Sequence, residues 1–219
     1  MIRFGNFADL GISKEIPKKE LDNIFLLLEK SYEEMLKNHP KNELIQNNED
    51  RNRNLLKKYM NENLGNFGLS YLVIVAECNV EDKNHNSIGY SDLKIFNFSD
   101  YNMENKEEMC FIIECKCLNK NYGGDKSLKK HYISEGILRF KKKYPSPFGV
   151  GSMLSFVQIK TPKDFIDKIK NFVEQNKINF IKSEFKESER VKSLFTHVTK
   201  HKNIEIYHLF LDMNKRQTL

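Results

Sequence analysis

The sequence of 219 residues lacks the long apolar runs that membrane proteins need. No stretch approaches the roughly eighteen consecutive apolar residues of a membrane helix. Only 39% of the residues are hydrophobic, and the mean hydropathy is −0.61, so we expect a soluble protein without a membrane partner. The segment from Met1 to Gly5 shows no apolar core of a secretory signal, which predicts a cytoplasmic location.

Cysteine is scarce and does not occur at metal-binding spacing. The four cysteines are Cys78, Cys110, Cys115 and Cys117, without a CxxC pair or a histidine-rich partner set. This argues against zinc and disulfides, and it predicts buried, reduced thiols. The sequence also contains no P-loop, GxGxxG or HExxH motif, so nucleotide hydrolysis and zinc proteolysis have no support.

Net charge alone does not identify a partner. The formal net charge is +6 and the pI is about 8.9. Such values suit a protein that binds a polyanion, but they also occur in many proteins that are rich in lysine and asparagine. The length suits one domain with a full core, and no internal repeat divides the chain. We therefore expect a single domain over 1–219, with an N-terminal helical extension at 1–48 and a core at 49–213.

Two strand-like segments, 90–96 and 110–117, contain the most informative pattern of the chain. Side chains alternate between the two faces of a strand. Glu114 and Lys116 therefore share one face of the second segment, and Asp92 lies on the polar face of the first. If the strands are neighbours, two carboxylates and an ammonium group converge on an otherwise apolar sheet. Burying these charges is unfavourable without a compensating ion, so the pattern indicates a divalent-cation site.

These residues resemble a known superfamily. Ser91-Asp92 followed by Glu114-Cys115-Lys116 is similar to the motif of the PD-(D/E)xK nucleases, the restriction-endonuclease-like phosphodiesterases. Ser91 replaces the proline of that motif. The interval between Asp92 and Glu114 implies a long hairpin loop.

The resemblance implies a metal-dependent reaction. Asp92 and Glu114, together with the backbone carbonyl of Cys115, would hold one Mg²⁺, which Mn²⁺ can replace. Lys116 would orient or deprotonate the attacking water, or stabilise the negative charge of the phosphate. For the role of base, a buried cationic neighbourhood would have to lower the pKa of Lys116.

Glu49 is a further candidate ligand, at the start of a predicted helix over 49–64. Asn47 or Asn48 would cap this helix. Glu49, Arg53 and the apolar residues after them follow helical spacing, which places Glu49 on the core-facing stripe. A glutamate on the first core helix often joins the metal site in the resembled superfamily. The alternative is an acidic residue of the first turn that is stabilised by the helix dipole.

Basic residues surround a second predicted helix, over 128–142. The candidates for nucleic-acid binding are Lys126, Lys129, Lys130, Arg139, Lys141 and Lys142. They would contact phosphates beside the site, or they would form a solvated basic face. Within the helix, Glu135 and Arg139 are spaced as an ion pair. The run from Tyr132 to Phe140 also resembles a group of bacterial PD-(D/E)xK-like proteins that are often encoded beside restriction or phage-defence genes.

The order of predicted elements favours a three-layer α/β/α sandwich around a mixed sheet, as expected of a restriction-endonuclease-like core. An N-terminal helix over 18–37 would pack on the core or form a dimer or partner surface. The charged region 182–202 reads as loop or short helix, with His197 and His201 on its surface. A last strand follows at 204–213.

We therefore expect a Mg²⁺-dependent nuclease, a DNA endonuclease by preference, with a role in restriction or phage defence that the resemblance alone implies. The alternative is a catalytically silent domain of the same fold that binds nucleic acid or a partner protein. Target recognition would come from the loops 79–89 and 97–109, from the N-terminal helix, or from a homodimer or partner subunit. The sequence does not distinguish between DNA and RNA as the substrate.

Overall fold

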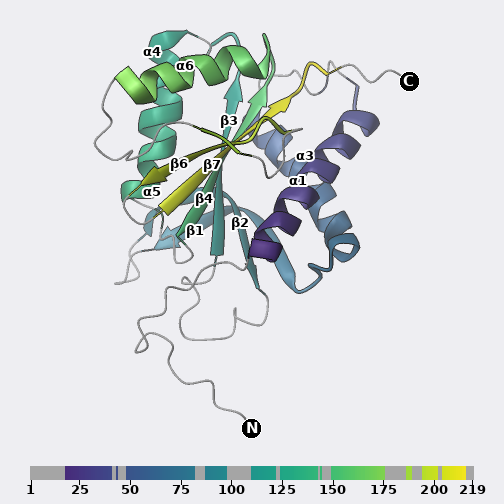
Figure 1. The fold of residues 1–219 in the computed structure, drawn as a ribbon. Coiled ribbons are helices and arrows are strands. Elements are labelled where there is room, and N and C mark those ends of the chain that lie inside the picture. The colour runs from purple at the N-terminus through teal and green to yellow at the C-terminus, as the bar shows by residue number, and fades with distance from the viewer. Residues whose placement is uncertain are drawn as a thin grey trace, which may run out of the picture.

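A seven-stranded mixed sheet forms the centre of the protein (Figure 1). The computed structural model describes residues 18–40, 43, 48–81, 87–97, 110–121, 124–142, 144, 149–175, 186–188, 194–201 and 204–215. The strands are β1 (Leu72–Glu81), β2 (Ser87–Asn97), β3 (Cys110–Leu118), β4 (Val150–Val157), β5 (Lys186–Glu187), β6 (His197–His201) and β7 (Ile204–Asp212). Their order across the sheet is β1-β2-β3-β4-β7-β6-β5.

The sheet changes from antiparallel to parallel pairing at its centre. β1, β2 and β3 pair antiparallel, β3, β4 and β7 pair parallel, and β5, β6 and β7 pair antiparallel. β4 is buried along nearly its whole length and is rich in small and apolar residues, as expected for a strand covered on both faces. The central parallel strands thus lie in the core of the molecule, and β3, which bears Glu114 and Lys116, is one of them.

One face of the sheet is covered by α1 (Lys18–Asn38) and α3 (Glu49–Asn63). Both helices present apolar residues at helical spacing to the sheet. Phe25 of α1 and Leu56 of α3 are fully buried in one core with Phe111 and Cys115 of β3. Of the two interpretations of the N-terminal helix, the structure confirms packing on the core. Asn48 accepts a hydrogen bond from the Arg51 N–H at 2.9 Å, which confirms it as the N-cap of α3.

The opposite face is covered by α6 (Pro162–Gln175) and by a helix in three parts. Its parts are α4 (Asp125–Leu128), the π-helical segment η4 (Lys129–Ile137) and α5 (Leu138–Lys142). A Cβ at Gly136 would lie 2.5 Å from the Cε of Met153, so the absence of a side chain lets this helix approach β4 closely. The predicted helix over 128–142 is confirmed, and the structure adds that it begins at Asp125 and is π-helical over Lys129–Ile137.

The architecture confirms an α/β protein with a mixed sheet and helices on both faces. The region 182–202 differs from the prediction, because it contributes β5 and β6 to the edge of the sheet. His201 is buried rather than exposed, since β6 turns it toward the core. Within the described residues, no helix combines the length and the apolar composition needed to cross a membrane.

Candidate functional site

The candidate site lies where β2 and β3 separate. The two strands pair from Phe96 and Cys110 to Leu93 and Ile113. Beyond this point β2 continues along β1, and β3 continues along β4. Asp92 and Glu114 are the next residues on the two strands. The predicted convergence of these two side chains is confirmed, because the register places them opposite one another on the same face.

Two carboxylates bind the free edge of β3 at this fork. Asp92 Oδ2 accepts a hydrogen bond from the Cys115 N–H at 2.7 Å, and Glu49 Oε2 accepts one from the Cys117 N–H at 2.7 Å. These N–H groups point toward the side from which β2 has diverged. Glu49 therefore reaches the site from the first turn of α3. The Cys115 carbonyl faces the same side, since the N–H and C=O of one strand residue point to one edge.

Glu114 is fully buried and lies at the centre of a charged cluster. Its Oε1 lies 2.6 Å from Lys116 Nζ and 2.6 Å from Arg139 Nη1, while Oε2 accepts a hydrogen bond from the Tyr144 hydroxyl. Tyr144 was not predicted as a site residue, and no spacing rule relates it to β3. The expected pair of Glu135 with Arg139 is wrong, because Arg139 turns inward to Glu114.

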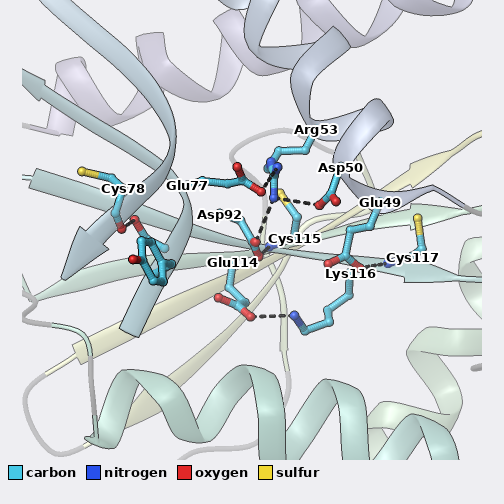
Figure 2. A network of polar contacts seen from close by, with 12 residues as sticks. Glu49, Asp50, Arg53, Glu77, Cys78, Asp92, Glu114, Cys115, Lys116 and Cys117 are labelled. Carbon is cyan, nitrogen blue, oxygen red and sulfur yellow. Dashed lines mark hydrogen bonds and ion pairs between the residues drawn. The ribbon is translucent and has the colours of Figure 1, made fainter. Parts of the chain in front are cut away.

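Arg53 is a second residue that the candidate set omitted. Its side chain is only 3% exposed, and its guanidinium contacts carboxylates from three elements (Figure 2). The distances are 3.1 Å to Asp50, 2.9 Å to Glu77 and 3.3 Å to Asp92. The sequence contained a signal for this role, since a charged residue on the apolar stripe of α3 must find buried partners. Arg53 thus reaches Asp92 from above in Figure 2, whereas Lys116 reaches Glu114 from the right.

Burial and mutual repulsion change the proton affinities of the carboxylates. Burial, with a further contribution from Glu114, raises the pKa of Asp92 to about 7. Burial also raises the pKa of Glu49, although Lys116 acts in the opposite direction. In Lys116, burial favours the neutral amine, but the charges of Glu114, Glu49 and Asp92 outweigh it and raise the pKa. The lowered pKa that the role of base would require is therefore not found, and Lys116 is an ammonium group.

The charges of the site suit a divalent cation. The carboxylates are Glu49, Asp50, Glu77, Asp92 and Glu114, and the cationic side chains are Arg53, Lys116 and Arg139. With all groups ionised, the carboxylates exceed the cations by two charges. No group of three or more acidic, histidine or cysteine side chains within the described residues is arranged to hold a metal. Mg²⁺ needs only one or two carboxylates beside waters and phosphates, so Asp92, Glu114 and the Cys115 carbonyl fit it chemically.

The basic residues predicted around the second helix do not lie together in the structure. Lys126, Lys129, Lys130 and Lys141 are exposed, whereas Arg139 lies at the site. Lys130 lies 3.7 Å from Glu135, and the side chain of Lys142 is outside the described residues. The predicted recognition loops 79–89 and 97–109 are described only in part, because residues 82–86 and 98–109 lie outside the described residues.

A pocket of about 640 Å³ opens beside Asp92. Its lining residues are Asp50, Arg53, Glu77, Gly89, Tyr90, Ser91, Asp92 and Arg139. This volume is large enough for a nucleotide-sized group. Tyr90 at its edge is 63% exposed, so an aromatic ring is available next to the carboxylates. The site therefore combines a pair of acidic residues, an ammonium group and an open pocket.

No protein-family model matches the chain, and no curated protein or solved structure is significantly similar to it. Its function therefore has to be inferred from this site.

Proposed function

We propose that the protein is a metal-dependent phosphodiesterase with a restriction-endonuclease-like core that cleaves nucleic acid, with DNA as the preferred substrate of an endonuclease reaction. The observation that carries the proposal is the meeting of Asp92 and Glu114 at the fork of β2 and β3, with Lys116 bound to Glu114 at 2.6 Å. This set provides hard oxygen ligands and a cationic donor, and Asp92 of the set also lines the open pocket. A phosphodiester reaction requires both.

Each residue has a distinct part in the proposed reaction. Asp92, Glu114 and the Cys115 carbonyl would bind Mg²⁺, which supplies Lewis acidity and a lowered pKa for bound water. Glu49 holds the edge of β3 through the Cys117 N–H, so it fixes the strand that bears Glu114. Lys116 is charged and donates a hydrogen bond. We therefore assign it to the orientation of the attacking water and to the charge that develops on the phosphate, rather than to proton abstraction.

The test is cleavage of supercoiled plasmid by the purified protein in Mg²⁺ or Mn²⁺. Asp92→Ala and Lys116→Ala are expected to reduce the rate by at least about 100-fold, because each removes a group from the reacting centre. Chelation of the metal should have the same effect. The matched controls are Asp167→Ala and Lys120→Ala, which remove the same charges from exposed positions. Equal activity of all four variants, or activity in chelator, would contradict the proposal.

A catalytically silent domain that binds nucleic acid or a partner protein is the second candidate. One observation favours it: protein groups already contact both oxygens of Asp92 and both oxygens of Glu114. In this case a purified protein that binds DNA would not cut it, with or without metal. Any activity would then come from a partner subunit, and mass measurement of the purified protein tests whether the protein forms a homodimer.

A further inference from the structure

Arg53 and Glu77 combine two energetically unfavourable features at the wall of the pocket. The Arg53 Nε–H is buried and has no hydrogen-bond partner among the described residues. Glu77 has a φ of 53°, a left-handed conformation that residues with a side chain rarely adopt. Both features lie in one ion pair, between Arg53 Nη2 and Glu77 Oε1. An unsatisfied donor and local backbone strain persist where the surrounding structure enforces them, and such places are often functional.

The strained residue holds the guanidinium in position. The register of β1 and β2 is kept on both sides of Glu77, at Ala76 and at Cys78, so the distortion is confined to one residue. It gives Arg53 Nη2 a carboxylate partner at 2.9 Å. Asp50 and Asp92 bind Nη1 from the other side. These contacts use three of the five N–H donors of Arg53, and its Nε–H has no partner among the described residues.

We propose that Arg53 is a substrate-binding residue that donates its Nε–H to a phosphate oxygen of the nucleic acid in this pocket. The inference rests on the proposed function for the identity of its ligand. Arg139 lines the same pocket, so two guanidinium groups flank the pair of Asp92 and Glu114. Guanidinium groups form strong, directional hydrogen bonds with phosphate.

The remaining lining residues agree with a nucleotide as the occupant. Three carboxylates in the wall already contact Arg53, which reduces their repulsion of a phosphate. The exposed ring of Tyr90 lies at the same pocket and offers a stacking surface for the base beside the phosphate. The phosphate would therefore lie between Arg53 and Arg139, within reach of Asp92.

The test is the affinity for a short DNA duplex in Mg²⁺, measured by fluorescence anisotropy in a Lys116→Ala background that prevents cleavage. Arg53→Lys retains the charge but lacks the Nε donor, and we expect it to weaken binding about tenfold or more. Arg51→Lys is the matched control on the same helix, where Arg51 is half-exposed and pairs with Glu43 at 2.9 Å. It should change the affinity less than about twofold.

A second measurement uses the unaltered Arg53, in case the variant does not fold. The Nε–H resonance of Arg53 in ¹⁵N-labelled protein should shift when the duplex is added, while that of Arg51 should not. Unchanged affinity of a folded Arg53→Lys protein, or an unshifted Arg53 resonance in saturated complex, would overturn the inference. Failure of the proposed cleavage is a separate result, because binding through Arg53 is read without any turnover. Cleavage by wild type with no effect at Arg53 would refute only this inference.

Discussion

The protein contains two buried polar networks that differ in charge. The fork network consists of Arg53, Asp92, Glu114, Lys116, Arg139 and Tyr144. The histidine network consists of Tyr132, Thr199, His201 and His208, on η4, β6 and β7. In the histidine network the Tyr132 hydroxyl lies 2.9 Å from His208 Nδ1, and Thr199 Oγ1 lies 2.9 Å from His208 Nε2.

The difference in charge distinguishes a network that maintains the fold from one that we propose binds a ligand. Burial, and then His201 and His197, lower the pKa of His208 well below its ordinary value, so its imidazole is neutral. Neutral groups that satisfy one another stabilise a core. The fork network instead contains charged groups, and Arg53, Asp92 and Arg139 of this network line an open pocket. Such an arrangement is unfavourable for stability by itself and is typical of functional sites.

The largest effect is expected for Glu114→Ala. This change leaves the Lys116 ammonium and the Arg139 guanidinium without their buried partner. The free energy of unfolding should fall by about 3–5 kcal/mol, as for other broken buried ion pairs. Urea unfolding followed by circular dichroism measures it. Unchanged stability would mean that these ion pairs do not form in solution. Glu114→Gln, which keeps the shape of the side chain, should lower the free energy of unfolding less than Glu114→Ala.

Metal should stabilise the fork network and leave the histidine network unaffected. At a Mg²⁺ concentration 100 times the dissociation constant, the folded state should gain about 2.7 kcal/mol. Thermal unfolding with and without Mg²⁺ measures the gain. It should vanish in Asp92→Asn and persist in Thr199→Val. An equal gain in the two variants would place the metal elsewhere.

Thr199→Val should break the histidine network without touching the site. The hydroxyl that lies between His201 Nε2 and His208 Nε2 is lost, and buried imidazole nitrogens lose their partner. Stability should fall by about 1–3 kcal/mol, the usual cost of unsatisfied buried groups. The rate of plasmid cleavage at a temperature where the variant is folded should equal that of wild type. A lower rate would show that the two networks are coupled.

The last effect concerns pH, and the two networks should respond in opposite directions. Because the pKa of Asp92 is raised to about 7, the folded state without metal binds more protons than the unfolded state. Its stability should therefore decline as the pH rises from about 4 to 7. The pKa of His208 is lowered, so its contribution is present above about 6.5 and is lost on acidification. Unfolding of Asp92→Asn and wild type across this range, in chelator, measures the first effect; parallel curves would contradict it.

Much of the fold could be predicted from local patterns. The alternation along β2 and β3 and the cap at Asn48 both depend on neighbouring residues. The strand β6 was missed because its sequence is charged and short. Its pairing with β7 is decided by contacts across the sheet rather than by propensity.

The candidate site divides in the same way. Asp92, Glu114 and Lys116 could be selected because spacing on strands sets which side chains share a face. Glu49 followed from helical spacing, and the structure brings it to Cys117. Tyr144 could not be selected, since its contact with Glu114 joins positions thirty residues apart.

The sequence by itself determined the alternation that brings an acidic pair to one face of a mixed sheet, because the period of a strand is a property of the backbone. Only the tertiary structure decided the electrostatics around that pair. The approach of α3 gives Asp92 the cationic partner Arg53, and carboxylates from three elements make Lys116 a charged donor. Charge interactions depend on distance and burial, and folding alone establishes both.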